Sequence, residues 1–103
     1  MAAIAPAAVL DRDREAIRAT LAAYGVERAG VFGSIARGED TTASDLDLIV
    51  VFRPGARRDL VSISEDLATL TGLSVDVVDR DRVIERVQRT GVGYRILRDT
   101  VPL

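Results

Sequence analysis

The stretch GSIARGEDTTASDLDLIVVF, residues 33–52, decides the fold. It opens with a Gly-Ser turn and closes with an apolar, β-branched run over residues 46–52, which predicts a strand covered on both faces. Asp45 and Asp47 interrupt this region two residues apart, so their side chains point to the same face, about 6–7 Å apart along the strand. Burying two unpaired like charges is unfavourable. The pair therefore predicts either a solvent-exposed strand start or a site for a divalent cation.

Helical and extended patterns alternate on both sides of this stretch. Alternation of this kind predicts an α/β (α+β) domain with a small mixed sheet of three to four strands and helices packed on it. The sheet is expected to be mixed because the link between the first two strands is too short for a full crossover helix. The predicted strands cover residues 26–32, 46–52 and 73–78. The predicted helices are one over 7–24 ended by Gly25, a short one within 33–37 that is followed by a loop over 38–44, one from a cap at Asp81 to about Arg89, and a short one around 94–98. A further helix, ended by Gly72, places Leu60, Ile63, Leu67 and Leu70 on one face.

Length and charge narrow the class of protein. With 103 residues, the chain is expected to form one domain, residues 1–103. The net charge is −2 and no run of basic residues stands out, which argues against direct nucleic-acid binding through phosphates. No apolar stretch is long enough to span a bilayer, and the N-terminus lacks the basic start of a signal peptide. We therefore expect no membrane partner and a cytoplasmic location.

The chain contains neither cysteine nor histidine. Disulfides and thiolate sites are therefore excluded, and zinc sites usually need one of these residues. A metal ion would have to be held by carboxylates, which favours Mg²⁺, or alternatively Mn²⁺.

A third carboxylate lies within the next predicted strand. Asp76 stands in the middle of the apolar run LSVDVVD, residues 73–79. If this strand lies beside residues 46–52, Asp76 can reach the same cation and take a proton from an attacking hydroxyl. The alternative is an exposed charge at the edge of the sheet. Asp79 and Asp81 are interpreted as turn and helix-cap residues.

The Gly33-Ser34 turn opens a short helix before the aspartate pair. Glycine lets the backbone approach a phosphate, and the following N–H groups and the serine hydroxyl can donate hydrogen bonds to it. Arg37, one turn later, either reaches a phosphate or pairs with Glu39 or Asp40 in solvent. Ser44 either orients the next aspartate or ends the loop.

Together these residues form the pattern G-S-x₁₀-D-x-D followed by a later aspartate. This combination resembles the nucleotidyltransferase superfamily that includes DNA polymerase β, and the segments GSIARGE, SDLDLIV and YRILRDTVPL are similar to its minimal nucleotidyltransferase branch. The resemblance implies a nucleotidyltransferase fold in which Gly33 and Ser34 hold a nucleoside triphosphate. It also implies that Asp45 and Asp47 bind two Mg²⁺ ions and that Asp76 completes the catalytic site. ATP is the implied donor of AMP to a hydroxyl group, although no residue here selects adenine.

The resemblance also implies a partner. Proteins of this branch typically act as antitoxins that bind a HEPN ribonuclease toxin and AMPylate one of its tyrosines. The HEPN part requires a histidine, which this chain lacks, in keeping with two separate proteins. Three alternatives stay open: an antitoxin that inhibits by binding alone, a stand-alone transferase for a small molecule such as an aminoglycoside, and a domain whose acidic residues are structural.

Overall fold

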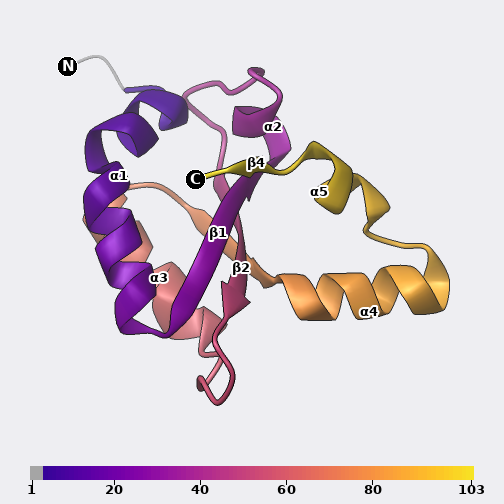
Figure 1. Cartoon of the computed structure of the whole chain (residues 1–103). Coiled ribbons are helices and arrows are strands. Elements are labelled where there is room, and N and C mark those ends of the chain that lie inside the picture. The colour runs from indigo at the N-terminus through magenta and orange to yellow at the C-terminus, as the bar shows by residue number, and fades with distance from the viewer. Residues whose placement is uncertain (1–3) are drawn as a thin grey trace.

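The computed structural model describes residues 4–103, so the first three residues of the predicted domain lie outside the described part (Figure 1). Helices and strands alternate along it, and a four-stranded sheet runs through the middle of the molecule. The elements are α1 (Pro6–Ala23), β1 (Val26–Phe32), α2 (Gly33–Ala36), β2 (Leu46–Phe52), α3 (Leu60–Thr71), β3 (Val75–Asp79), α4 (Arg80–Thr90), α5 (Tyr94–Asp99) and β4 (Val101–Pro102).

The sheet is mixed, as predicted, with the strand order β3-β2-β1-β4. Strand β1 is antiparallel to both β2 and β4, whereas β2 and β3 are parallel. Chain connectivity explains the difference, because α3 provides the crossover that two parallel strands need. Strand β2 consequently lies inside the sheet, with a neighbour on each side.

Helices α1 and α3 cover one face of the sheet, on the left of Figure 1. Leu46, Leu48 and Val50 of β2 point into this layer and are fully buried. They pack with residues of the two helices such as Ile17 and Ile63. The predicted alternation of β2 is therefore confirmed, and Asp47 points to the opposite face.

That opposite face is covered only in part, by α4 and α5. A smaller apolar cluster forms there around Phe32, Ile49 and Val83. Helix α4 begins at the end of β3 and extends away from the sheet, to the right in Figure 1. The face that carries Asp47 therefore has open space beside its small core.

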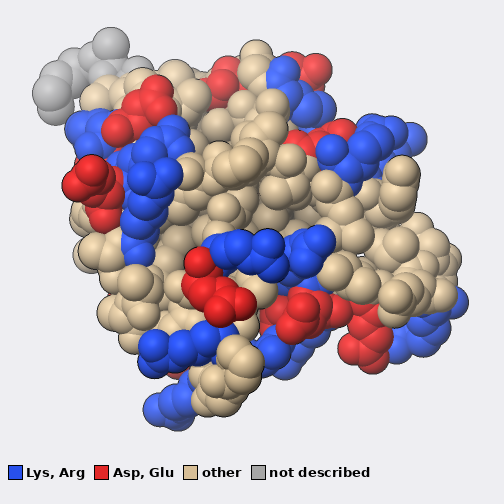
Figure 2. Space-filling view, viewed as in Figure 1, with Lys and Arg blue, Asp and Glu red and all other residues tan. Residues whose placement is uncertain are grey.

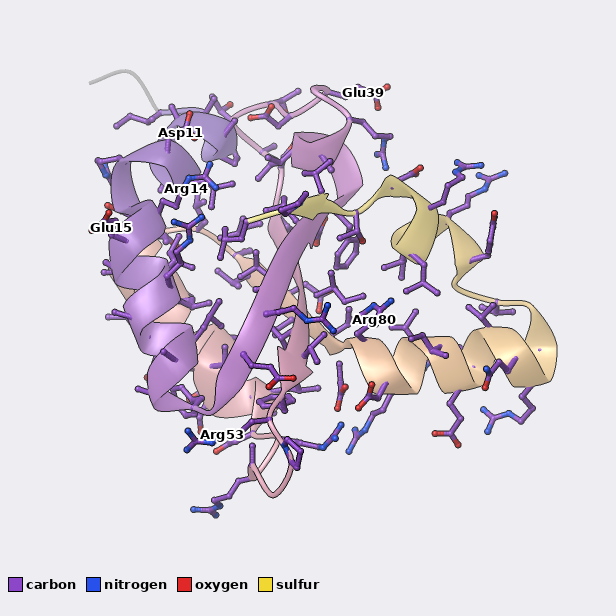
Figure 3. All side chains as sticks on the ribbon, in the orientation of Figure 1. Asp11, Arg14, Glu15, Glu39, Arg53 and Arg80 are labelled. Carbon is purple, nitrogen blue, oxygen red and sulfur yellow. The ribbon has the colours of Figure 1, made fainter. Side chains whose placement is uncertain are left out.

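The sequence of helix α1 explains where the helix begins and ends and which of its faces is buried. Pro6 occupies its first turn, and Gly25 follows its end with φ = +83°, a conformation that favours glycine. Leu10 and Ile17 are buried against the sheet, while the charged Asp11, Arg14 and Glu15 lie around the outside of the helix (Figure 3).

Within residues 4–103, no helix has both the length and the apolar character that crossing a bilayer requires.

Four details of the predicted elements were wrong. The third strand runs over Val75–Asp79 instead of 73–78, and the short strand β4 was not predicted. Helix α4 is capped by Asp79, whose carboxylate accepts a hydrogen bond from the Asp81 N–H at 3.0 Å, so Asp81 is not the cap. Leu70 is 39% exposed, because the last turn of α3 buries Thr71 instead.

Candidate active site

Asp47 and Asp76 are register partners in the parallel pair of β2 and β3. Register partners on neighbouring strands project to the same face of a sheet. Asp47 is half-buried because β2 is an inner strand, and Asp76 is exposed because β3 is at the edge. The third predicted strand therefore does lie beside the second, which was the condition for Asp76 to join the site.

Gly33 packs directly on Asp47. Phe32, the last residue of β1, pairs with Asp47 across the sheet, so α2 begins beside this carboxylate. A Cβ at Gly33 would lie 2.2 Å from Asp47 Oδ2, and its φ of +74° is a conformation that favours glycine. Ser34 follows, half-buried, and its carbonyl accepts a hydrogen bond from the Glu39 N–H at 2.9 Å. The Gly-Ser turn and the aspartate strand thus meet at one place.

The electrostatics of Asp47 reflect this crowding. Partial burial raises the pKa of Asp47, and the negative charges of Asp76 and Asp45 raise this pKa further. The positive charge of Arg37 lowers it, by a smaller effect. The charges of three residues therefore act on one carboxylate, and a bound cation would relieve the repulsion between Asp47 and the other two aspartates.

Arg37 contacts one of the two partners that the sequence suggested. Its Nε donates to Glu39 Oε2 at 3.0 Å on the exposed loop after α2, where Figure 3 labels Glu39. Asp40 instead accepts a hydrogen bond from the backbone N–H of Ala7 at 3.0 Å, which ties the loop to the start of α1. The guanidinium of Arg37 nevertheless acts on Asp47, so its role toward a phosphate stays a prediction.

Ser44 ends the loop before β2. Its hydroxyl oxygen accepts a hydrogen bond from the Thr41 N–H at 2.9 Å, a local turn contact. This contact supports the loop-ending interpretation over the orientation of Asp45. Asp45 itself is exposed, one residue before the strand begins.

The three aspartates offer a donor set of carboxylates alone, which suits a hard cation such as Mg²⁺. The register of β2 and β3 brings Asp47 and Asp76 together, and Asp45 lies directly before the start of β2. Within residues 4–103, no three acidic side chains converge closely enough to hold a metal ion in this arrangement. The donor chemistry therefore fits, and the assignment of all three as metal ligands stays a prediction.

A cavity of about 490 Å³ lies on the same face of the sheet and was not predicted. Its floor includes the paired residues Gly30 and Ile49, and Ile49 follows Asp47 by two positions on the same face of β2. Gly30 is required there because a Cβ would lie 2.5 Å from Thr100 Cγ2. No sequence motif marks this cavity, because β1, β2, β4, α4 and α5 all contribute to it.

Comparisons with known proteins agree on the family. Residues 14–101 match the family model described as "Nucleotidyltransferase domain". The chain is 35% identical over 80 residues to "Protein adenylyltransferase MntA" of Thermococcus cleftensis, a match that covers 76% of this chain and 75% of that protein. It is 43% identical over 56 residues to "Putative protein adenylyltransferase MJ0435" of Methanocaldococcus jannaschii. This second match covers 53% of the chain and only 60% of that relative's length.

Solved structures share the fold. The structure entitled "Structure of putative minimal nucleotidyltransferase" superposes with a TM-score of 0.72 at 37% identity, over 94% of this chain and 95% of that one. A structure described as the toxin-antitoxin MntA-HpeT with the mutation Y104A matches with a TM-score of 0.63 at 20% identity. That match covers 87% of this chain and 70% of the other, and it supports the fold alone.

Proposed function

This chain belongs to the nucleotidyltransferase domain family, and we propose that it transfers AMP from ATP to a hydroxyl group of a partner toxin protein, thereby acting as an antitoxin. The observation that carries the proposal is the juxtaposition of Gly33 with Asp47 and of Asp47 with Asp76. A turn suited to phosphates and neighbouring carboxylates on one face are the two parts that nucleotidyl transfer needs.

Each predicted site residue has a role in this reaction. Gly33 and Ser34, at the start of α2, hold the triphosphate through backbone N–H groups and the serine hydroxyl. Arg37 binds a phosphate oxygen from the end of that helix. Asp45, Asp47 and Asp76 would hold Mg²⁺, with two ions expected. When bound, Mg²⁺ neutralises the charge of the phosphate oxygens.

The chemical step breaks one bond and forms one. The acceptor oxygen attacks the α-phosphorus of ATP, the bond from this phosphorus to the oxygen that bridges to the β-phosphate breaks, and pyrophosphate leaves. Asp76 accepts the hydroxyl proton, since it is exposed at the edge of the sheet where an acceptor can approach. Positioning of the two substrates on this face supplies much of the rate.

The identity of the acceptor rests on the relatives. The relative that is 35% identical bears the name MntA, and MntA is also named in the toxin–antitoxin structure that shares this fold. We infer that the acceptor is a toxin of the HEPN ribonuclease type and that its modified group is a tyrosine. We further infer that residues 1–103 act as one domain and that the reaction takes place in the cytoplasm, where ATP and Mg²⁺ are available.

Mass spectrometry tests the proposal directly. A toxin protein of the HEPN type, the inferred acceptor, is incubated with the chain, ATP and Mg²⁺, and its intact mass is measured. We expect a mass increase of one or more AMP units, located on a tyrosine by peptide mapping. The variant Asp45→Ala with Asp47→Ala should give no increase.

A matched control removes two carboxylates elsewhere. Asp11→Ala with Glu15→Ala changes the net charge equally on the exposed side of α1, and it should leave the transfer intact. A stable complex without any mass increase would overturn the enzymatic proposal and favour inhibition by binding alone.

A further inference from the structure

Positive charge is concentrated in one part of this acidic protein. Residues 80–99, which span α4 and α5, contain six arginines and three acidic residues, a formal charge of +3 in a chain whose net charge is −2. We call this segment the basic arm. It extends from the sheet on the side of Asp47 (Figure 1), and Figure 2 shows blue basic surface along the right of the molecule with red acidic surface among it. This uneven distribution of charge was not predicted from the sequence, because the arginines do not form a continuous run.

The arginines of α4 form a stripe on one side of the helix. Arg82, Arg86 and Arg89 follow the spacing i, i+4, i+7 and are all exposed. Val83 faces the small core, and Glu85 lies on the exposed side of the helix, three positions after Arg82 and four before Arg89. The positive side chains therefore outnumber the acidic side chain that lies among them on this surface.

These arginines are also free of carboxylate partners. Among residues 4–103, Arg98 pairs with its neighbour Asp99 at 3.0 Å, whereas the other arginines of the arm form no ion pair. The other five ion pairs involve arginines of α1, Arg37 directly after α2, and Arg58 in the loop before α3. An exposed guanidinium without a partner is available to an incoming anion.

The cavity of about 490 Å³ lies at the root of the arm. Arg80, the first residue of α4, and Arg28 of β1 line it, while Ile49, Val51 and Leu97 provide an apolar floor and wall. Figure 3 labels Arg80 where α4 leaves the sheet. The cavity thus suits an apolar or aromatic side chain flanked by carboxylates.

Exposed apolar residues on the arm favour a protein over a nucleic acid as its partner. Val92, in the turn between α4 and α5, is 60% exposed, and Tyr94, the first residue of α5, is 59% exposed. Arginine and exposed aromatic or aliphatic side chains together are typical of protein–protein interfaces. A partner with an acidic surface would complement both the charge and the apolar parts of this region.

We propose that the basic arm and the cavity at its root are the docking surface for the acceptor protein, which presents an acidic segment that carries the acceptor tyrosine. The proposal rests on the proposed function for its acceptor, and it assigns the residues that recognise this acceptor. Because Ile49 in the cavity lies two positions from Asp47 on the same face of β2, a segment docked here has its hydroxyl group close to the carboxylates.

A fluorescent random copolymer of glutamate and tyrosine is the probe, since it carries both the acidic charge and the acceptor group. Its affinity for the full chain is measured by anisotropy without ATP, at low and at moderate salt. We expect binding that weakens with salt, and a loss of about tenfold or more in Arg82→Glu with Arg86→Glu. Neutral Arg82→Gln with Arg86→Gln should lose less, and circular dichroism confirms that both variants remain folded.

The matched control reverses two arginines away from the arm. Arg53 and Arg57 are exposed in the loop between β2 and α3, and Figure 3 labels Arg53 at the end of the sheet away from α4. Arg53→Glu with Arg57→Glu changes the net charge equally and should keep the affinity. An equal loss in this control would overturn the proposal, as would tighter binding of a single-stranded RNA of matched length than of the copolymer.

Failure of this inference is distinguishable from failure of the proposed function. The variant Asp45→Ala with Asp47→Ala should bind the copolymer as the unaltered chain does, while it loses AMP transfer. Docking without transfer would contradict the proposed function alone. Transfer that is unaffected by Arg82→Glu with Arg86→Glu would contradict the docking surface alone.

Discussion

Gly33 and Asp47 are in contact, although 14 positions separate them in the chain: a Cβ at Gly33 would lie 2.2 Å from Asp47 Oδ2. The antiparallel pairing of Phe32 with Asp47 creates this contact, because β1 ends and α2 begins beside the carboxylate. The turn that would hold a phosphate and the residue that would hold a cation are therefore parts of one structure.

Gly33→Ala should remove most of the activity. Its φ of +74° is unfavourable for alanine, and the new methyl group would push the Asp47 carboxylate aside. We expect a loss of about 1–3 kcal/mol in the free energy of unfolding and about a hundredfold slower AMP transfer. Gly38→Ala is the control, because Gly38 has φ = +70° but nothing within 4 Å of a Cβ. Equal losses of activity in the two variants would argue against the contact with Asp47.

Asp47→Asn should raise stability while it abolishes transfer. The pKa of Asp47 is raised, so the folded state holds its proton more tightly than the unfolded chain, and the charged form destabilises the fold above the ordinary aspartate pKa of 3.8. We expect a higher midpoint of thermal unfolding at pH 7 than in the unaltered chain. The difference should shrink as the pH falls through the raised pKa towards 3.8. A lower midpoint at pH 7 would contradict the repulsion that we infer.

Asp79→Ala should be the most destabilising of the carboxylate substitutions tested. Asp79 is 2% exposed, caps α4, and accepts a hydrogen bond from Arg58 Nη1 at 2.6 Å. Its loss removes the cap and the partner of a guanidinium, which we expect to cost about 2–4 kcal/mol in denaturant unfolding. Asp81→Ala removes only the exposed contact to Arg58 and should cost less than about 1 kcal/mol. Similar losses of unfolding free energy in the two variants would show that the burial of Asp79 does not determine its contribution to stability.

Arg37→Ala separates the two interpretations of Arg37. If its guanidinium binds a phosphate, the dissociation constant of ATP should rise about tenfold with little change in the midpoint of unfolding. Glu39→Ala removes the ion pair but keeps the guanidinium, so ATP should bind at least as tightly as before. An unchanged affinity of Arg37→Ala for ATP would contradict phosphate binding and would favour the interpretation that Arg37 only pairs with Glu39.

Much of the fold followed from local patterns. The helices and strands from Pro6 to Phe52 lie where periodicity and glycines placed them, because buried faces repeat every 3.6 or 2 residues. The errors lie where a tertiary contact overrides the pattern. Arg58 pairs with Asp79 and so helps to place the cap of α4 there, and the two-residue strand β4 is too short for any periodic signal.

The sequence by itself determined the candidate chemistry: the Gly33-Ser34 turn, the carboxylates of Asp45, Asp47 and Asp76, and the exclusion of thiolate and histidine ligands. Only the tertiary structure decided which of these meet, because the parallel register of β2 and β3 sets Asp76 beside Asp47. It also decided that α4 and α5 leave a cavity and a basic arm on that face. Such features depend on the directions in which separate elements leave the sheet, and no local stretch of residues encodes those directions.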